Sequence, residues 1–270
     1  ELVDLLRPSN KNYNVHIYDN SFTISSDIIK DKFIQKLNLL CTSLIQVNYY
    51  PSNNNIGFGS GCNKAIEKGC YETIVIVNCD TSFRDTHLNN FENVANQCNY
   101  HIPIIGPKII SDSGLMHPSC FSFDPISIAL KPFRHVSHIG KFSKYIPEYK
   151  SIKNRIDRIT YEGISKEEPS YVDWVSGCFM FINREFFNKS LGFDERYFMY
   201  FEDVDLSRKA KQLGLKVMFD PSLEIIHEAQ HSSRSVKGII RSIFLNATAR
   251  YHLISWIKYM FKWREDFKSK

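Results

Sequence analysis

The stretch ETIVIVNCD, residues 72–80, limits the possible folds more than any other feature of the sequence. Its near-continuous β-branched run is expected of a central strand that is buried on both faces and ends at Asp80. Two further strand candidates, at residues 15–18 and 44–50, are each followed by a stretch with helical periodicity or by a Gly/Asn-rich turn that leads into a helix. This alternation predicts an α/β fold with a mostly parallel central sheet flanked by helices.

The pattern of the chain changes twice beyond residue 110. Residues 111–170 are loosely patterned, and such a long stretch inside a compact domain is typical of functional loops. The C-terminal residues 236–270 are rich in Lys and Arg around an apolar stripe at helical spacing: Ile240, Phe244, Ala247, Tyr251, Ile254, Ile257 and Phe261. We therefore predict a domain over residues 1–235 and a basic amphipathic helical segment over residues 236–270.

Composition narrows the class of protein. A hydrophobic content of 43% is enough for a packed core, and a net charge of +5 is too mild to indicate nucleic acid as a partner. The seven cysteines are never spaced as CxxC, which favours a reducing compartment over a disulfide framework. Because there is no signal peptide and no uncharged apolar run of about 18 residues, the sequence predicts a cytoplasmic protein. The chain starts at Glu1, inside an apparent helix, so we expect further residues upstream.

Three polar clusters follow predicted strands, and a fourth would lie at the same edge, where open α/β sheets bind their ligands. They are Asp19-Asn20-Ser21, residues 78–81, the region of His227 and the loop of residues 55–59. Each cluster can also be explained by polar side chains that hydrogen-bond to the backbone of their own loop. Four clusters at one edge, however, favour a binding site. The loop NNNIGFGSG matches neither the Walker A nor the GxGxxG pattern, so its glycines are expected to let backbone pass close to a ligand or a strand.

Asp80 is the most specific of these polar residues. An acid directly after a buried strand can coordinate Mg²⁺ or Mn²⁺ on the phosphates of a nucleotide donor, although it can also cap the next turn. Asn78 stands where a second acid would strengthen the site, so the cation would be held together with the donor's own phosphates. His227 can complete the site, since imidazole binds Mn²⁺, but a lone His after an apolar strand also fits a core position.

The stretch YFMYFEDVDLSRKA, residues 197–210, has three acids directly behind a group of aromatics: Glu202, Asp203 and Asp205. A helix is predicted over about residues 202–213, with Gly214 as its C-cap. Acids are favoured in the first turn of a helix, and Asp205 can pair with Lys209 at i+4. The preceding aromatics favour a different function, a shelf for a sugar ring beside a general base, which places Tyr200 on the acceptor side.

The order of these motifs resembles glycosyltransferase family 2, the inverting enzymes of the GT-A fold, and within it the rhamnosyltransferase-type members that build bacterial cell-surface polysaccharides. The resemblance covers roughly residues 15–233 and rests on YDNSFTISSD, NNIGFGSGCNKAI, VIVNCDT, VDWVSGCFMFINREFF, GFDERYFMYFEDVDLSRKAKQLG and IIHEAQHSS. Two features differ from the family's pattern. The first acid of its DxD element is Asn78, and its first strand would precede Glu1.

The resemblance implies a role for each matching residue. Asp203 would be the general base that deprotonates the acceptor hydroxyl, with Glu202 as the other member of the catalytic pair. Asp80 would hold Mg²⁺ or Mn²⁺ on the diphosphate, with His227 as a further ligand. The other positions would border the pockets: Asp19 at the nucleotide base, Asn55, Gly57 and Gly177 along the donor, and Trp174 on the acceptor side.

The implied function is transfer of rhamnose from dTDP-rhamnose to a glycan or polyprenyl-linked acceptor in cell-surface polysaccharide synthesis. Two alternatives stay open: the same fold with a UDP-hexose or UDP-galactofuranose donor, and a non-catalytic member that binds glycan or scaffolds an assembly. The helical segment 236–270 fits either the inner face of the cytoplasmic membrane, near a lipid-linked acceptor, or packing on the domain or a partner subunit.

Overall fold

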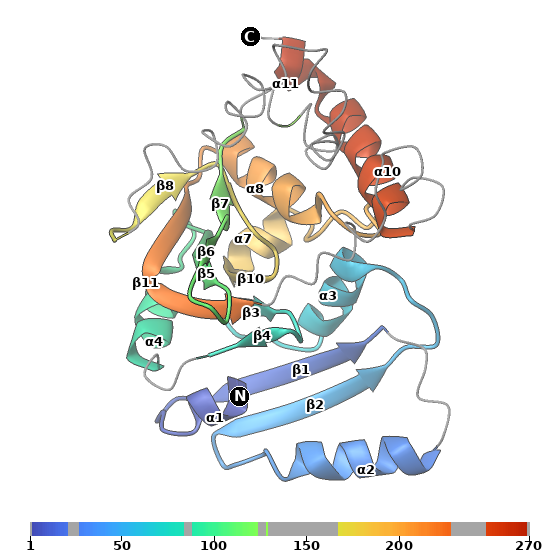
Figure 1. Ribbon diagram of the computed structural model, residues 1–270, viewed down its shortest axis with the longest axis vertical. Helices are drawn as coiled ribbons and strands as arrows, with labels where there is room; N and C mark the ends of the chain where they lie inside the picture. The colour runs from blue at the N-terminus through green and yellow to red at the C-terminus, as the bar shows by residue number, and fades with distance from the viewer. Residues whose placement is uncertain are drawn as a thin grey trace.

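The computed structural model describes residues 2–20, 27–83, 88–123, 128, 167–227 and 247–268. Most of the predicted loop region 111–170 and the first part of the predicted C-terminal segment, residues 236–246, lie outside the described residues. Figure 1 shows the described elements arranged as a central sheet flanked by helices. The predicted α/β class is therefore confirmed.

The central sheet has seven strands. Its main path runs through β3 (Thr73–Val77), β10 (Phe179–Asn183), β5 (Ile104–Ile110), β11 (Val217–His227) and β4 (Thr81–Ser82), with β6 (Met116–His117) on β5 and β8 (Ser170–Val172) on β11. The prediction of a mostly parallel sheet is wrong for these strands, because the sheet is mixed. Only β5 and β11 pair in parallel, whereas β10 is antiparallel to both of its neighbours.

The direction of β10 is not readable from its sequence, because its side chains are buried on both faces of the sheet. Met180 and Ile182 belong to one hydrophobic core, and Phe179 and Phe181 belong to the other. Successive side chains of a strand point to opposite faces, so a strand that is apolar throughout fills both cores equally well. Such a strand can accept a parallel or an antiparallel neighbour, and the path of the whole chain decides between them.

Helices cover the two cores on the two faces of this sheet. One face is covered by α3 (Phe58–Ile66), α7 (Arg184–Lys189) and α8 (Glu202–Gln212). The other face is covered by α1 (Leu2–Leu6) and α4 (Leu88–Gln97). Burial of apolar side chains on both faces fixes the ends of the strands relative to the start of α8, where the candidate site lies.

Two smaller strand pairs complete the described fold. β1 (Tyr13–Asp19) and β2 (Ile45–Pro51) are parallel, in register from Tyr13 opposite Ile45 to Asp19 opposite Pro51. Figure 1 shows α2 (Asp27–Asn38) lying along the outer side of this pair. β7 (Cys120–Phe121) and β9 (Trp174–Val175) form an antiparallel pair. The predicted strand at residues 15–18 is thus confirmed as part of β1.

The C-terminal helices α10 (Ala247–Lys262) and α11 (Arg264–Lys268) pack beside α8 on a third core. The packed face of α10 and the turn after it contribute three almost fully buried residues: Ser255, Tyr259 and Trp263. Three large residues of the predicted apolar stripe are exposed instead: Ile254, Ile257 and Phe261. The predicted helix is confirmed over the described residues, but the predicted stripe is not the face that packs. Large apolar residues occur on both sides of α10, so periodicity alone does not select the buried side.

Candidate active site at the start of helix α8

The backbone just before α8 is strained. Tyr200 and Phe201 have positive φ angles of 68° and 69°, a left-handed conformation that costs a bulky residue about 1–3 kcal/mol. Phe201 is fully buried, and its ring lies 5.5 Å from that of His252 and 5.2 Å from that of Tyr259, between ring centroids. This packing holds the strained turn, and α8 begins directly after it with Glu202. The predicted start of the helix is confirmed.

Asp203 is oriented by two backbone N–H groups. The N–H of Gly177 donates to Oδ2 at 2.9 Å, and the N–H of Val204 donates to Oδ1 at 2.8 Å. A Cβ on residue 177 would lie 3.1 Å from the Cβ of Asp203, so glycine permits this close approach. The side chain is half-buried, and an ionised carboxylate has more acceptor positions than the two used here. Asp203 is therefore fixed in direction and still able to accept a proton.

Glu202 faces a different element from Asp203. It is 6% exposed and lies against the start of α3, where a Cβ on Gly59 would be 3.3 Å from the Cβ of Glu202. Burial, and then the charge of Glu202, raise the pKa of the Cys62 thiol to about 12. The two acids of the predicted catalytic pair thus point to different places: Glu202 toward α3, and Asp203 toward the turn before β10.

The predicted donor-side loop lies against the segment before α8. Gly57 has a φ of +91°, and a Cβ there would collide with the carbonyl oxygen of Phe198. The N–H of Phe58 donates to that same oxygen at 2.9 Å. Asn55 supports the turn, because its Oδ1 accepts from the N–H of Gly57 at 3.0 Å. Glycine is required at residue 57 on both conformational and steric grounds.

Asn20 secures the same loop, a role that the sequence analysis did not assign. Its Oδ1 accepts from the N–H of Ile56 at 3.0 Å, and its Nδ2 donates to the carbonyl of Gly57 at 2.7 Å. The preceding residue, Asp19, accepts a hydrogen bond from the hydroxyl of Tyr49. Burial, and then this hydrogen bond, raise the pKa of Tyr49 to about 12. The signal for Asn20 in the sequence is its place in the polar cluster that follows the first strand.

The two predicted metal ligands lie next to each other. His227 ends β11 and Asp80 lies in the turn after β3, with Nε2 and Oδ1 3.1 Å apart. The side chain of Asp80 is 43% exposed, so the pair is open to solvent on that side. Two ligand atoms at right angles, each about 2.1 Å from an octahedral cation, would be about 3.0 Å apart. The pair therefore fits two adjacent coordination positions of Mg²⁺ or Mn²⁺.

Asn78 adds an unsatisfied oxygen to the same turn. Its N–H donates to the carbonyl of Cys178 at 2.9 Å, and its carbonyl accepts from the hydroxyl of Thr81 at 2.7 Å. Its Oδ1, however, is buried and finds no hydrogen-bond donor in the part of the chain that the structure describes. Such orphaned acceptors are uncommon, and an amide oxygen is a ligand that hard cations accept.

The described residues do not form a complete metal cage. Within the described ranges, no group of three or more His, Cys, Asp or Glu side chains converges to hold a cation. Asp80 and His227 therefore suit a cation that takes its other ligands from water and phosphate oxygens, as Mg²⁺ commonly does. The two side chains thus fit the Mg²⁺ or Mn²⁺ ion that the sequence implies.

A short turn, residues 176–178, lies between the predicted base and the predicted metal ligands. Gly177 donates to Asp203, while Cys178 accepts from the backbone of Asn78. Burial, with smaller contributions from the charges of Asp203 and Asp80, raises the pKa of the Cys178 thiol to about 12. The turn is thus hydrogen-bonded to Asp203 through Gly177 and to the segment that precedes Asp80 through Cys178. Nothing in the sequence singles out Cys178 for this position.

The two predicted acceptor-side aromatics have different surroundings. Trp174 is 4% exposed, and its ring stacks on that of Phe121 at 3.9 Å between centroids. Tyr200 is half-buried, and its ring meets that of His252 edge-on at 5.0 Å. Trp174 therefore belongs to the third core, whereas Tyr200 lies three residues before Asp203 with part of its surface accessible.

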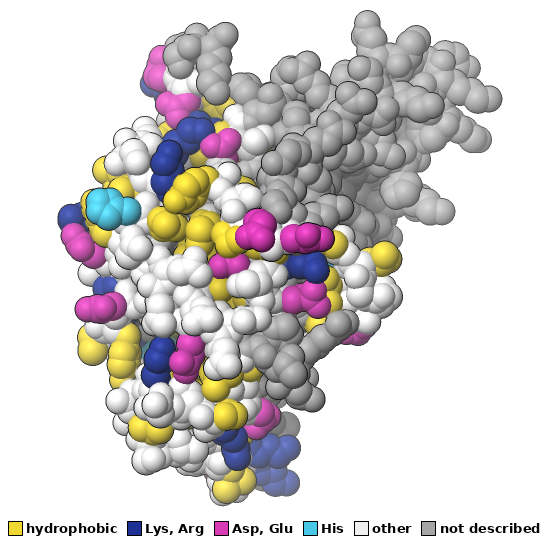
Figure 2. Space-filling model, turned by 90° about the vertical axis from the view of Figure 1, so that its left-hand side faces the viewer, with side chains coloured by type: hydrophobic (Ala, Val, Ile, Leu, Met, Phe, Trp, Pro, Cys, Tyr) yellow, Lys and Arg dark blue, Asp and Glu magenta, His cyan; other side chains and the backbone are white. Residues whose placement is uncertain are grey.

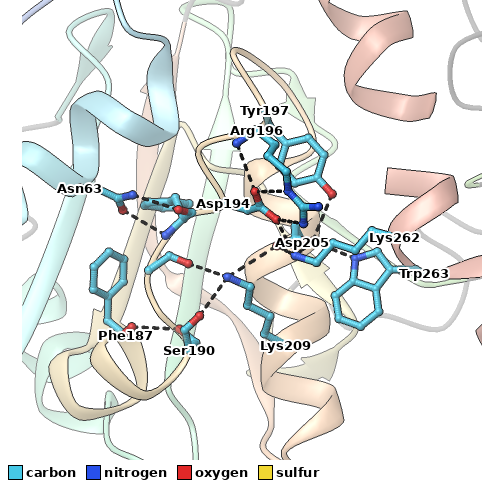
Figure 3. Close-up of polar contacts among 12 residues, drawn as sticks. Asn63, Phe187, Ser190, Asp194, Arg196, Tyr197, Asp205, Lys209, Lys262 and Trp263 are labelled. Atoms are coloured by element: carbon cyan, nitrogen blue, oxygen red, sulfur yellow. Dashed lines mark hydrogen bonds and ion pairs between the residues drawn. The ribbon is translucent and has the colours of Figure 1, made fainter. Parts of the chain in front are cut away.

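Asp205 is completely buried. Figure 3 shows its carboxylate among the side chains of Tyr197, Lys262 and Trp263. Its carboxylate is approached by Lys262 at 2.7 Å, Trp263 Nε1 at 2.8 Å, the Tyr197 hydroxyl at 3.2 Å and Lys209 at 3.7 Å. The predicted pair with Lys209 is confirmed. The interpretation that helix-start electrostatics explain Asp205 is incomplete, because its shortest contacts are to residues more than 50 positions away in the sequence.

The amino-acid sequence is similar to those of known proteins. No family model matches the chain. It is 36% identical over 89 residues to the rhamnosyltransferase WbbL of Escherichia coli (strain K12), which covers 33% of this chain and 31% of that protein. Over 198 residues it is 26% identical to the N-acetylglucosaminyl-diphospho-decaprenol L-rhamnosyltransferase of Mycobacterium tuberculosis (strain ATCC 25618 / H37Rv), covering 69% of this chain and 60% of that protein. The chain thus spans less than two thirds of the length of these relatives.

Likeness to solved structures is weaker. The crystal structure of GalNAc-T7 with UDP, GalNAc and Mn²⁺ has a TM-score of 0.49 and 13% identity, over 82% of this chain and 41% of that chain. The crystal structure of A197 from STIV has a TM-score of 0.39 and 15% identity, over 79% of each chain. Both scores lie under 0.5, so neither likeness bears on the site or its chemistry.

Proposed function

We propose that this protein is an inverting glycosyltransferase that transfers rhamnose from dTDP-rhamnose to a glycan or polyprenyl-linked acceptor, with Asp203 as the general base. The observation that carries the proposal is the placement of Asp203. Its carboxylate is fixed by the N–H of Gly177, follows a strained aromatic turn and keeps free acceptor capacity. A purely helix-capping acid would need neither the glycine contact nor the strain.

Similarity in sequence supports the class of reaction. Both relatives reported above are named as rhamnosyltransferases, and the mycobacterial one is named for an acceptor that carries a diphospho-decaprenol. Each name describes that protein. For this chain, rhamnose as the donor sugar and a lipid-linked acceptor are proposals that need their own test.

The reaction would be a single displacement at the anomeric carbon of the donor. The acceptor oxygen forms a bond to that carbon while its proton passes to the carboxylate of Asp203. The bond from the anomeric carbon to the diphosphate oxygen breaks, and the nucleotide diphosphate leaves with the electron pair. Because the acceptor and the leaving group lie on opposite faces of the sugar, the configuration at the anomeric carbon inverts.

Asp80 and His227 would hold Mg²⁺ or Mn²⁺ at the donor diphosphate, with the Oδ1 of Asn78 as a further oxygen. When bound, the cation would neutralise the charge that develops on the departing diphosphate. The turn of residues 176–178 bonds to Asp203 through Gly177 and to Asn78 through Cys178. In a single displacement the cation and the base would lie on opposite sides of the donor sugar.

The residues around β1 would bind the base of the nucleotide. Asp19 ends β1 and presents a carboxylate that already accepts from Tyr49. Thymine and uracil both carry an imide N–H, which a carboxylate can accept. The loop held by Asn20 and Asn55 would then lie along the donor, where Gly57 brings backbone close to the segment before Asp203.

The proposal is tested with a panel of nucleotide sugars on the full-length protein. Product formation is followed by mass spectrometry with dTDP-rhamnose, a UDP-hexose and UDP-galactofuranose, each with Mn²⁺ and a synthetic N-acetylglucosaminyl-diphospho-polyprenol. We expect transfer from dTDP-rhamnose alone. Transfer only from a UDP-sugar would overturn the donor assignment, and no transfer together with no calorimetric binding of any donor would favour the non-catalytic scaffold.

A further inference from the structure

Helix α10 has two faces with different surroundings. The face with Ser255 and Tyr259 is buried on the third core. The opposite face exposes three large apolar residues at helical spacing, with exposed fractions of 46% for Ile254, 52% for Ile257 and 69% for Phe261. Packing on the domain therefore explains one side of the helix and leaves an apolar side in contact with water.

Basic residues border this exposed apolar face. Arg250 and Lys258 are exposed on α10, and Arg264 is exposed at the start of α11. The ammonium of Lys258 donates to the carbonyl of Arg196 at 2.6 Å, and Arg264 pairs with Glu265 at 3.2 Å. The guanidinium of Arg264 lies over the ring of Phe261, 4.7 Å from its centroid. Among the exposed residues described from 247 to 268, Glu265 is the one acid. By contrast, the side of the molecule that carries β8 and α4 shows both signs of charge interspersed (Figure 2).

We propose that this face of α10 docks in the plane of an anionic membrane surface. Ile254, Ile257 and Phe261 would enter the interface while the flanking cations pair with lipid phosphates, which is the pattern of in-plane amphipathic helices. The proposal rests on the proposed function, since it supplies the means to reach a lipid-linked acceptor. Among the described residues, no helix has the length and apolarity to cross a bilayer.

The charge of the face favours lipid over a second copy of this chain. A two-fold contact through this face would bring the cations of one copy close to those of the other, and like charges at short distance repel. Anionic headgroups would instead neutralise them, at roughly 1 kcal/mol for each Lys or Arg near the surface, or about fivefold in affinity.

The first half of α10 contacts the candidate active site. The ring of Tyr251 lies 4.4 Å from that of Phe198 between centroids, and the hydroxyl of Ser255 donates to the carbonyl of Met199 at 2.8 Å. Both partners belong to the segment that leads into Asp203. A membrane bound to the outer face of α10 would thus be one helix away from the proposed general base.

The test is flotation of the full-length protein with vesicles of phosphatidylcholine containing about 30% phosphatidylglycerol, and with vesicles of phosphatidylcholine alone. The apolar variant changes three residues of the face: Ile254→Gln, Ile257→Gln and Phe261→Gln. The matched control changes three exposed leucines elsewhere: Leu39→Gln, Leu115→Gln and Leu213→Gln. We expect the apolar variant to lower the partition coefficient on anionic vesicles roughly tenfold or more, and the control to leave it unchanged.

A charge variant tests the other half of the proposal. Arg250→Gln, Lys258→Gln and Arg264→Gln together should lower binding to anionic vesicles by about fivefold per residue, and added salt should act in the same direction. Thermal unfolding of each variant checks that the fold is kept. Equal flotation of the wild type and both variants, or equal binding to neutral and anionic vesicles, would overturn the proposal.

Two further measurements, sedimentation and a transfer assay, distinguish membrane docking from a dimer contact and from the proposed function. A concentration-dependent dimer in sedimentation that the apolar variant abolishes, with no vesicle binding by the wild type, would mean that a second copy covers the face and would overturn the proposal. Transfer to a short water-soluble acceptor should be equal for the wild type and the apolar variant. If transfer occurs without vesicle binding, only this inference fails; if vesicle binding occurs without transfer, the proposed function fails and the membrane face stands.

Discussion

Asp203 and Asp205 lie two residues apart on α8, yet their surroundings are opposite. Asp203 is half-buried, and its described hydrogen bonds come from two backbone N–H groups and not from a cationic side chain. Asp205 is fully buried, and Lys262 approaches its carboxylate at 2.7 Å. A buried charge needs a paired cation, whereas a carboxylate that must accept a proton needs an open side and a fixed direction. The comparison separates an acid suited to chemistry from an acid that holds the fold.

The largest expected effect comes from removing the proton acceptor. Asp203→Asn keeps the shape of the side chain but removes its basicity, so we expect transfer to fall by about 10²–10⁴-fold. Stability and calorimetric binding of dTDP-rhamnose with Mn²⁺ should be close to those of the wild type. Undiminished transfer by this variant would show that Asp203 is not the base.

The next prediction concerns the cluster around Asp205. Lys262→Met leaves the buried carboxylate without its nearest cation, and we expect the free energy of unfolding to fall by about 3–5 kcal/mol. Urea unfolding measures this loss. The control is Lys64→Met, which breaks an exposed pair with Glu67 at 3.2 Å and should leave the midpoint nearly unchanged. Equal losses of unfolding free energy for Lys262→Met and Lys64→Met would contradict the distinction between the buried and the exposed ion pair.

The loop before α3 gives a comparison between two glycines. Gly57 has a φ of +91° and a ψ of 169°, and a Cβ there would collide with Phe198, so Gly57→Ala should cost about 3 kcal/mol. Gly114 has a φ of +79° and no neighbouring atom within 4 Å of the place that a Cβ would occupy, so Gly114→Ala should cost only about 1 kcal/mol. Denaturant unfolding compares the two, and a smaller loss for Gly57→Ala would refute the close contact between this loop and the segment before α8.

The metal ligands should affect cation affinity more than stability. Asp80→Ala and His227→Ala should each weaken Mn²⁺ binding in the presence of a nucleotide diphosphate by roughly tenfold, which electron paramagnetic resonance of free Mn²⁺ measures. His101→Ala, an exposed histidine outside the site, is the control. Removal of the metal with EDTA should stop transfer by the wild type. Unchanged Mn²⁺ affinity in both variants would remove Asp80 and His227 from the metal site.

The smallest expected effect is a pH dependence of stability in the charged cluster. Burial acts to raise the pKa of Asp194, but hydrogen bonds from Arg196 and Lys262 outweigh it and hold the pKa well below its usual range. This contribution to stability is present above the ordinary Asp pKa of about 4 and is lost as the pH falls below it. Urea midpoints from about pH 7 to about pH 3 should therefore fall less steeply for Asp194→Asn than for the wild type, and parallel curves would contradict the assignment.

Features that depend on residues close together in the sequence were predictable, and features that depend on distant residues were not. The start of α8 at Glu202 and Gly214 just beyond its end were predictable, because acids in a first turn and a glycine after the last turn are local signals. The direction of β10 was not predictable, since its side chains are buried on both faces. The side of α10 that packs on the domain was not predictable from periodicity, because Tyr259 and Trp263 are selected by contacts with α8.

In the candidate site, too, local motifs were readable from the sequence and long-range contacts were not. The motif order brought Asp203, Gly57, Asp80 and His227 forward, and the structure places them in two neighbouring pairs: Asp80 lies beside His227, and Gly57 lies against the segment before Asp203. The roles of Asn20 and Cys178 depend on backbone groups 36 to 100 positions away, namely Ile56 and Asn78. No local pattern specifies such contacts, so only the folded chain reveals them.

If Asp203 deprotonates the acceptor for a single displacement, the configuration of the product must show it. Nuclear magnetic resonance of the first product formed from dTDP-rhamnose, in a single turnover, reports the anomeric configuration before any rearrangement. We expect an anomer opposite to that of the donor, formed by the wild type and not by Asp203→Asn. Retention of the donor's configuration would contradict the single displacement.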